Sequence, residues 1–526
     1  MANEQPNILF IQCDQMAAPV LPCYGGRVVR ARHIDRLAAE GVVFENAYCN
    51  SPLCAPSRFS MMAGQLPSKI AAYDNAAEFS AEHPTFAHGL RDLGYATSLC
   101  GKMHFVGPDQ LHGFEERLTT DIYPADFGWT PDWEQGEARQ DYFHSMLSVV
   151  EAGSCSRSMQ LDFDDEVAFQ ATRKIFELAR SDDERPFFLL TSFTHPHDPY
   201  TINEPYWSLY RDDDIDLPSV PALSWEAQDP HSRRLYNNYD IDRYALTETR
   251  IRAARRAYYG AISYLDDHIG RLIAAMEETG LRENTMILLT GDHGDMLGER
   301  GLWYKMTFFE WAARVPLIIS APGRLEPGRR RAPVSLLDLF PTLIDSAAVG
   351  VESCATSVEL PEALPGHSLL PLLQGEDGAD KRCIQGEYLG ESAAGPLVML
   401  RRGDHKYVVG EASPPQLFNL ATDPLELQNL AGSPANATLE AAFAEEVSTT
   451  WNFPELREAV IASQRRRRFV FRALRRGAPK SWDFQPHIDA AERYARNLTG
   501  ALGDQERLVR LPRSAEPLPD GPAAKP

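Results

Sequence analysis

Residues 51–64 read Ser51-Pro52-Leu53-Cys54-Ala55-Pro56-Ser57-Arg58-Phe59-Ser60-Met61-Met62-Ala63-Gly64. Pro56 has a fixed φ and no N–H to lose, so it suits the first turn of a helix, and the apolar residues after it continue the helix. Cys54 is therefore predicted at a helix N-terminus, where free N–H groups favour an anion. Arg58, one turn further on, adds a permanent positive charge. Taken alone, a cysteine is more often a buried structural residue.

Short apolar segments alternate with amphipathic helical stretches over roughly the first 370 residues, which predicts an α/β fold with a large, mainly parallel sheet flanked by helices. Four apolar segments lead directly into polar residues: 8–11 into Asp14, 96–100 into Lys102 and His104, 187–193 into His195 and His197, and 285–290 into Asp292 and His293. Because ligands of open α/β sheets bind at the carboxyl ends of the strands, we expect one site at this edge.

Each of these residues has an ordinary alternative explanation. An aspartate after a strand is commonly a turn or N-cap residue, and the segment His195-Pro196-His197 is commonly a loop. Their joint occurrence favours a site. Asp14 and Asp292 offer carboxylate oxygens and His293 offers one nitrogen, a set that suits Ca²⁺ or Mn²⁺ better than a structural Zn²⁺.

A cysteine followed by proline at the second position and arginine at the fourth is the pattern of type I sulfatases, and the segment 292–295 is similar to a second signature of that family. The chain resembles these formylglycine-dependent enzymes of the alkaline phosphatase superfamily. The resemblance implies that a formylglycine-generating enzyme oxidises Cys54, and that the hydrate of the product attacks sulfur. It also implies one divalent metal, bound by Asp14, Cys54, Asp292 and His293.

The same resemblance implies roles for further residues. Arg58 and Lys102 would fix the charges of formylglycine and sulfate, His104 would act as the base, and His197 with Lys305 would assist the leaving oxygen. Two positions depart from many sulfatases. Gln15 stands where a second aspartate is common and is not counted as a ligand. His293 stands where asparagine is common, as in the phosphonate-hydrolase and choline-sulfatase branches.

Two longer segments, residues 101–130 and 482–497, are similar to the choline-sulfatase branch. The match covers nearly the whole chain and implies hydrolysis of choline-O-sulfate to choline and inorganic sulfate. It also implies a homotetramer, a dimer of dimers, in which the tail of each subunit crosses to a neighbour. By resemblance the residues around the trimethylammonium head are Asn75, Trp129, His144 and Glu387, with Asp504 as a tail carboxylate displaced by a one-residue insertion.

Residues 121–133 contain four aromatic residues among three aspartates, a composition that can hold a quaternary ammonium group. Without the resemblance, an aromatic-rich packing segment is the better explanation. Three other functions stay open: a sulfatase for another alkyl or aryl sulfate, a phosphonate monoester or phosphodiester hydrolase, and a non-catalytic protein that binds quaternary ammonium compounds. The intact set of Cys54, Arg58, Asp14, Asp292 and Lys305 argues against the last.

The 526 residues include 52 Lys and Arg against 74 Asp and Glu, a net charge of -22, which argues against a nucleic-acid-binding protein. In so acidic a chain, the basic cluster Arg465–Arg468 is better explained as a solvated helix face or a subunit contact. The first residues predict no signal peptide, and no apolar run is long enough to cross a membrane. The scattered cysteines indicate reduced thiols, so we expect a cytoplasmic protein.

Three regions are expected along the chain. Residues 1–380 would form the catalytic domain, and residues 381–470 a small α+β subdomain with an antiparallel sheet, because short strands such as 396–400 and 406–409 follow there. Residues 471–526 would form an extended oligomerisation tail with a disordered end, since the last residues are rich in proline, alanine and charge.

Overall fold

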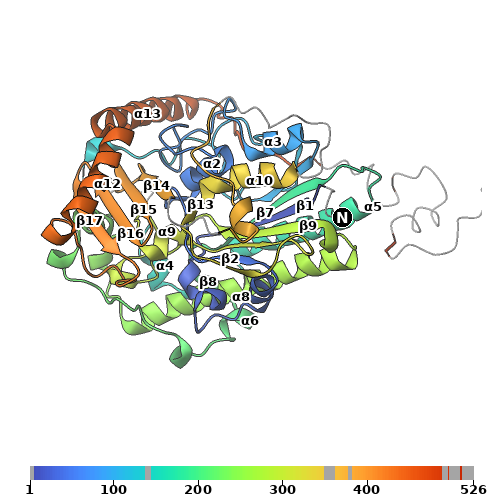
Figure 1. The fold of residues 1–526 in the computed structure, drawn as a ribbon, viewed down its shortest axis with the longest axis horizontal. Helices are drawn as coiled ribbons and strands as arrows, with labels where there is room; N and C mark the ends of the chain where they lie inside the picture. Colours follow the sequence, from blue (N-terminus) through green and yellow to red (C-terminus); the bar gives the residue numbers. More distant parts are fainter. Residues whose placement is uncertain are drawn as a thin grey trace, which may run out of the picture.

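The computed structural model describes residues 5–136, 144–348, 362–376 and 382–487, together with residues 496, 510 and 511. A central eight-stranded sheet dominates it (Figure 1). In spatial order its strands are β12 (Gly328–Arg330), β2 (Val42–Phe44), β11 (Leu317–Ser320), β9 (Thr285–Gly291), β1 (Asn7–Asp14), β7 (Phe187–Pro196), β4 (Ala96–Gly101) and β5 (Glu116–Arg117).

The inner strands β9, β1, β7 and β4 run parallel to one another, whereas β11 is antiparallel to both of its neighbours. The residues of β9 are all buried, as are those of β7. Strands covered on both faces read as continuous apolar runs, which explains why 187–193 and 285–290 could be recognised in the sequence. The predicted mainly parallel α/β sheet is confirmed.

Helices cover both faces of this sheet (Figure 1). On one face, α5 (Met159–Arg180) and α8 (Glu248–Glu278) pack against each other and on β7, with α1 (Arg32–Ala39) beside α8. The other face carries α2 (Cys54–Ala63), α3 (Phe86–Asp92) and α10 (Leu339–Ala347), which pack on one another. The sheet edge with the carboxyl ends of the parallel strands therefore lies between two helical layers.

Helix α2 begins at Cys54, with Leu53 in the extended conformation as its N-cap and Pro56 in its first turn. Every residue of α2 is buried. It ends at Gly64, whose φ of 63° is the left-handed conformation that glycine adopts without strain. The prediction that Cys54 lies at a helix N-terminus is confirmed.

A second sheet follows, a four-stranded antiparallel meander of β14 (Cys383–Tyr388), β15 (Leu397–Arg402), β16 (His405–Gly410) and β17 (Ser413–Asn419). Helix α12 (Ala437–Thr450) packs on it, with the rings of Phe443 and Tyr407 stacked 5.5 Å apart. Leu66 and Leu337 join the same small core, so the meander is fixed to the large sheet. The predicted C-terminal antiparallel sheet is confirmed, while the domain boundaries at 380 and 470 stay predictions.

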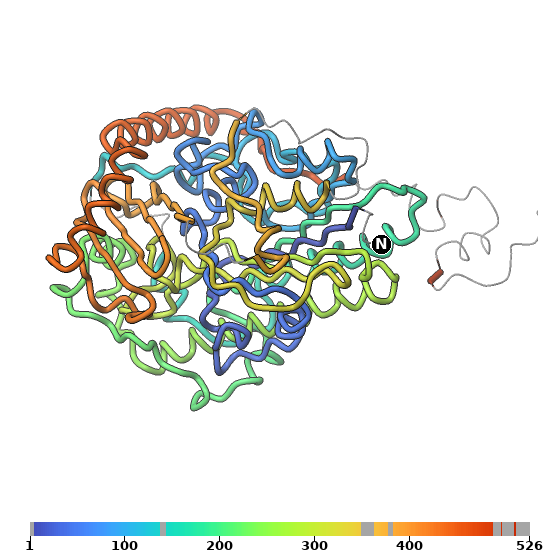
Figure 2. Tube along the Cα trace, in the orientation of Figure 1, coloured from blue at the N-terminus to red at the C-terminus, as the bar shows by residue number. Residues whose placement is uncertain are grey.

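Helix α13 (Phe453–Leu474) follows α12 and lies beside the segment that follows α2. In Figure 2 its red-orange trace runs next to a blue one. Smaller elements complete the described chain. They are β3 (Ala47–Tyr48), β10 (Arg314–Val315), β13 (Val334–Ser335), β6 (Gly153–Cys155), β8 (Thr201–Asn203), α4 (Leu147–Val150), α6 (Glu204–Trp207), α7 (Pro230–Asn238), α9 (Glu310–Ala313) and α11 (Leu370–Leu373).

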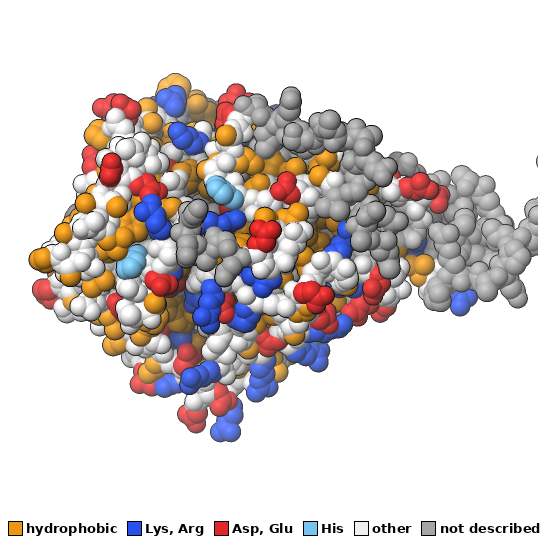
Figure 3. Space-filling model, viewed as in Figure 1, with side chains coloured by type: hydrophobic (Ala, Val, Ile, Leu, Met, Phe, Trp, Pro, Cys, Tyr) orange, Lys and Arg blue, Asp and Glu red, His pale blue; other side chains and the backbone are white. Residues whose placement is uncertain are grey.

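Three global expectations can be compared with the structure. Among the described helices, none combines the length and apolar character needed to span a membrane. The cysteines of the described residues are all free thiols. On the face drawn in Figure 3, acidic and basic side chains are interspersed and form no single basic patch.

Candidate active site

The carboxyl ends of β9, β1, β7 and β4 lie side by side, and the polar residues after them converge there. Asp14 ends β1, and Asp292 and His293 follow β9. With Cys54 from α2 they form a buried group whose ligand atoms all lie within 4.8 Å of one another. The structure thus brings the four predicted metal ligands together.

The imidazole of His293 has the orientation of a metal ligand. Its Nδ1 lies 3.0 Å from the carbonyl oxygen of Gly294, so Nδ1–H is the donor and Nε2 carries the lone pair. Nε2 faces the cluster, 3.2 Å from Cys54 Sγ and 3.7 Å from Asp14 Oδ1. Burial lowers the pKa of His293 to about 4, so the ring is neutral near pH 7.

Arg58 organises the two carboxylates. It is fully buried, and it donates from Nε to Asp292 Oδ2 at 2.8 Å and from Nη2 to Asp14 Oδ2 at 3.1 Å. Lys102 forms a second buried ion pair with Asp14. Burial alone would raise the pKa of Asp14, but Lys102 and Arg58 hold this pKa well below its usual value. Both acids are fixed in place, and both suit a divalent cation.

Cys54 joins this cluster to a cavity. Burial raises the pKa of its thiol to about 12, with a further contribution from Asp14. The unmodified thiol is therefore protonated at neutral pH and lacks the thiolate character of a nucleophilic cysteine. Its Sγ, 3.8 Å from Asp14 Oδ1, marks the place that an oxygen of formylglycine would take.

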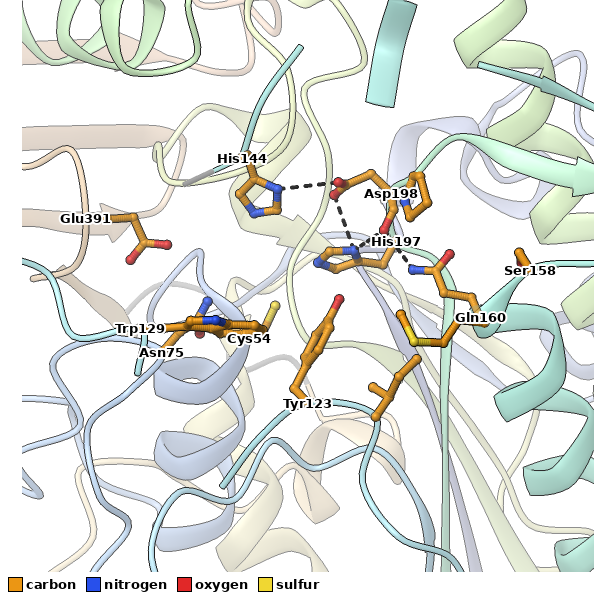
Figure 4. Close-up of a pocket in the computed structure, with 13 residues that line it drawn as sticks. Cys54, Asn75, Tyr123, Trp129, His144, Ser158, Gln160, His197, Asp198 and Glu391 are labelled. Carbon is orange, nitrogen blue, oxygen red and sulfur yellow. Dashed lines mark hydrogen bonds and ion pairs between the residues drawn. The ribbon is translucent and has the colours of Figure 1, made fainter. Parts of the chain in front are cut away.

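The cavity beside Cys54 has a volume of about 320 Å³ (Figure 4). Its walls combine aromatic rings, two carboxylates and four amide or imidazole side chains. The lining residues are Cys54, Asn75, Ile122, Tyr123, Trp129, His144, Ser158, Met159, Gln160, His197, Asp198, Pro199 and Glu391. Asn75, Trp129, His144 and His197 were predicted as site residues, whereas Tyr123 was recognised only as part of an aromatic segment.

His197, which lines the cavity, forms a hydrogen bond with Lys305. Lys305 Nζ donates to His197 Nε2 at 2.7 Å, while His197 Nδ1–H donates to the carbonyl oxygen of Asp198 at 2.6 Å. Burial and the charge of Lys305 hold the pKa of His197 well below its usual range, so the imidazole is neutral. Lys305 Nζ also donates to Gln15 Oε1 at 2.5 Å, so one of its three ammonium protons is left for a substrate oxygen.

His104 is buried, and both of its ring nitrogens lack a hydrogen-bond partner among the described residues. Its ring meets Trp129 edge to face at 5.6 Å. Burial, with the nearby charge of Lys102, lowers its pKa to about 3. A buried imidazole beside the cavity residues Tyr123 and Trp129, with both nitrogens free of hydrogen bonds to the described residues, can bond to a bound ligand.

The two carboxylates in the cavity wall are Asp198 and Glu391, and the sequence alone did not identify either. Asp198 lies between His197 and His144 (Figure 4), 3.4 Å from His144 Nδ1. Glu391 lies across the cavity, and burial raises its pKa to about 7, with a smaller contribution from Asp74. Asp198 directly follows the predicted His197 and could have been found from that position.

Glu387, which was predicted to contact the head group, is not among the lining residues. Its carboxylate accepts from Ser68 N and Ser68 Oγ, both at 2.7 Å, and from Trp451 Nε1 at 2.6 Å. Glu387 lies on β14, four residues before Glu391. The sequence offers no signal that separates the two acids. Asp504 lies outside the described residues.

The aspartates of the aromatic segment are also occupied elsewhere. Asp121 accepts from Arg117 Nη2 at 2.6 Å and from the backbone N–H of His104 at 2.8 Å. Asp132 forms an ion pair with Arg468. The aromatic part of the prediction fits the structure better, because Tyr123 and Trp129 line the cavity, with their ring centroids 5.0 Å apart and their planes at 64°.

Comparisons with known proteins agree with this geometry. Residues 6–349 match the Sulfatase family, residues 458–511 match the family described as Choline sulfatase enzyme C terminal, and residues 298–452 match N-sulphoglucosamine sulphohydrolase, C-terminal. The choline-sulfatase of Rhizobium meliloti (strain 1021) is 46% identical over 520 residues, which cover 98% of this chain and 100% of that protein.

More distant relatives share the fold. The arylsulfatase of Clostridium perfringens (strain 13 / Type A) is 30% identical over 455 residues, covering 82% of this chain and 91% of that protein. The crystal structure of the phosphonate monoester hydrolase of Agrobacterium radiobacter superposes with a TM-score of 0.66 at 25% identity, covering 85% of this chain and 95% of that one. The chain belongs to the sulfatase family and carries the C-terminal region of the choline sulfatases.

Proposed function

We propose that the protein hydrolyses choline-O-sulfate to choline and inorganic sulfate. One observation carries the proposal: a single cavity has the buried Cys54 at one wall and Tyr123, Trp129 and Glu391 at the others. The first wall suits a sulfate ester, and the others suit a cation. The 46% identity to a choline-sulfatase over nearly the whole chain supports the same substrate.

The sulfatase family implies a metal ion and the conversion of Cys54 to Cα-formylglycine, and the residues present fit both. Two carboxylate ligands, one imidazole lone pair and the position of Cys54 form a compact, oxygen-rich donor set, so we propose Ca²⁺ or Mn²⁺. When present, the ion supplies positive charge that stabilises anionic oxygens, and the formylglycine hydrate supplies the hydroxyl group that attacks sulfur.

The chain's own residues would then act as follows. Arg58 keeps Asp14 and Asp292 in place through its two hydrogen bonds, and Lys102 adds charge beside them. Cleavage of the ester S–O bond leaves negative charge on the choline oxygen, which must take up a proton. Lys305 Nζ, paired with the neutral His197, holds a proton for that oxygen. His104, neutral and without a hydrogen-bond partner among the described residues, would accept the proton of the second hydroxyl of the hydrate.

The head group would lie against the rings of Trp129 and Tyr123, near the carboxylate of Glu391. A quaternary ammonium has no N–H, so aromatic faces and a nearby negative charge are the means of binding it. A desolvated cation–π contact is worth about 2 kcal/mol. Asn75 completes this side, and its Oδ1 accepts from Ala55 N at 3.0 Å, next to Cys54.

We also propose a homotetramer in which the C-terminal tails cross between subunits, as the match of residues 458–511 to the choline sulfatase C-terminal family supports. Light scattering coupled to gel filtration measures this directly. A monomer at micromolar concentration contradicts it.

The test of the function uses the full-length protein co-produced with a formylglycine-generating enzyme. Mass spectrometry of the Cys54 peptide should show the aldehyde, and the protein should release sulfate from choline sulfate. Cys54→Ala should bind choline sulfate without turnover, because the nucleophile is absent. The proposal fails if the modified protein leaves choline sulfate intact, or if a phosphonate monoester has the higher kcat/KM.

A further inference from the structure

We propose that Arg467 and Gln464 of α13 are positioning residues that set the specificity of the head-group site. They hold the three chain segments that present Asn75, Trp129 and Glu391 to the cavity. The inference rests on the proposed function only for the identity of the head group. None of the three segments belongs to α13, and each is reached from it through hydrogen bonds.

The first segment is held by a buried ion pair. Arg467 donates from Nη1 to Asp74 Oδ1 at 2.6 Å and from Nη2 to Asp74 Oδ2 at 2.7 Å, and the two side chains are 7% and 0% exposed. A bidentate pair of this kind fixes the orientation of both partners. Asn75 follows directly, and its bond to Ala55 N carries the connection to the N-terminus of α2.

The second segment carries Trp129. Arg467 Nη1 also donates to Thr130 Oγ1 at 3.3 Å, immediately after that tryptophan. Gln464 Oε1 accepts from the backbone N–H of Trp133 at 3.0 Å, and Arg468 forms an ion pair with Asp132. The segment is therefore tied to one face of α13 at successive points directly after Trp129.

The third segment is reached through Trp133. Its indole Nε1 donates to the carbonyl oxygen of Gly390 at 2.9 Å, and Glu391 is the next residue. Trp133 is buried, and its backbone is bound by Gln464. Gln464 thus supports Trp129 and Glu391 together, whereas Arg467 supports Asn75 and Trp129.

Charge adds a second reason for Arg467. Asp74 is fully buried, and its negative charge contributes to the raised pKa of Glu391. The guanidinium of Arg467 neutralises Asp74, and removing one partner of a buried pair leaves the other charge uncompensated. The neighbouring Arg466 is exposed, so the basic cluster contains both a positioning arginine and a matched control. The expectation that the whole cluster is a solvated face or a subunit contact is wrong for Arg467.

The test compares Arg467→Gln, Arg467→Lys, Gln464→Ala and the control Arg466→Gln on two substrates. One is choline sulfate, and the other is 3,3-dimethylbutyl sulfate, a sulfate ester of the same shape whose head group carries no charge. Arg467→Gln should lower kcat/KM for choline sulfate between about 10-fold and 100-fold, mainly through KM, because small displacements of binding groups have effects of this size. The kcat/KM for the ester with the uncharged head group should change less than about threefold.

Arg467→Lys keeps the charge but cannot form the bidentate pair with Asp74. Its kcat/KM for choline sulfate should therefore lie between those of Arg467→Gln and the wild type. Arg466→Gln should behave as wild type on both esters. Equal losses on the two esters, or equal effects of Arg466→Gln and Arg467→Gln, overturn the inference.

Hydrogen exchange separates this inference from the proposed function. Arg467→Gln should increase amide exchange in 74–77 and 129–133, with no change in strand β1, and Gln464→Ala should do so in 129–133 and 388–391. If the wild type fails to hydrolyse choline sulfate, the substrate assignment is wrong, and the exchange data still decide the positioning role. Unchanged exchange in these segments for both variants overturns it.

Discussion

At the residue scale, Arg58 allows Asp14 and Asp292, two of the proposed metal ligands, to lie close together in the interior. Two buried carboxylates repel each other, and Arg58 binds both through one planar group. Isolated buried charges are costly, whereas a hydrogen-bonded network of opposite charges is tolerated. Arg58 therefore holds the two carboxylates of the site in place. The family resemblance implied another role for it, that of fixing the charges of formylglycine and sulfate together with Lys102.

Arg58→Lys tests this role. Lysine keeps the charge but cannot donate to Asp14 and Asp292 in the same fixed plane. We expect the affinity for Ca²⁺ or Mn²⁺ to fall between about 10-fold and 100-fold, as for other residues that orient metal ligands. The rise in melting temperature on adding the ion measures the metal affinity. Arg466→Lys, a substitution at an exposed arginine, is the control. An unchanged metal response in Arg58→Lys contradicts the role.

Glu387 and Glu391 form a second residue-scale test, because both are buried acids four positions apart. Glu391 lines the cavity, whereas Glu387 is bound by Ser68 and Trp451. Glu391→Gln should raise KM for choline sulfate roughly tenfold, the loss of one charge contact of about 1.4 kcal/mol. Glu387→Gln should lower the melting temperature instead. Steady-state kinetics and thermal unfolding of both variants measure these effects. A raised KM in Glu387→Gln and a lowered melting temperature in Glu391→Gln would mean that Glu387, and not Glu391, contacts the head group.

At the element scale, the C-terminal end of α2 packs tightly against α10 at Gly64. Gly64 ends α2 with a positive φ, and a Cβ added there would lie 3.0 Å from both Phe340 and Leu364. Gly94 also has a positive φ, but open space surrounds it. The two glycines separate backbone strain from steric overlap.

Gly94→Ala should lower the free energy of unfolding by about 1 kcal/mol, which is the backbone term alone. Gly64→Ala should cost more, because Phe340 must also move, with a total of roughly 2–4 kcal/mol. Chemical denaturation of both variants measures the difference. Equal losses would mean that the α2–α10 junction has room for a methyl group.

Local patterns predicted the elements that carry the chemistry. The segments 187–193 and 285–290 are continuous apolar runs because neighbours cover both of their faces, and Pro56 marks the start of α2 through its own backbone restriction. The edge strands β5 and β12 are two and three residues long, too short for any periodicity to appear. In the meander, β15 and β16 were recognised in part, but β14 and β17 were not.

The site was predictable where its residues follow strands or repeat a motif. Asp14, Asp292 and His293 are of this kind. The sequence could not distinguish Glu391 from Glu387 as a cavity residue, because the two acids are only four positions apart. Only the three-dimensional structure shows that Glu391 lines the cavity. The partner of Asp74 lies 393 residues away in Arg467, and no local pattern records such a pairing.

At the scale of the whole molecule, the two sheets have distinct parts in the site. The parallel sheet supplies the anion and metal end, through Asp14, Asp292 and His293. The C-terminal region contributes Glu391 after β14 and supports the cation end through α13. The substrate specificity of this chain is therefore expected to depend on its C-terminal third together with Tyr123 and Trp129, and its chemistry on the first two thirds.

One cavity is proposed to recognise a sulfate ester and a fixed positive charge together. The most direct measurement is the ratio of kcat/KM for choline sulfate to that for 3,3-dimethylbutyl sulfate with the wild-type protein, because the two esters differ only in the charge of the head group. A desolvated cation–π contact of about 2 kcal/mol predicts a ratio of roughly 30 in favour of choline sulfate. A ratio of one or less would contradict the account.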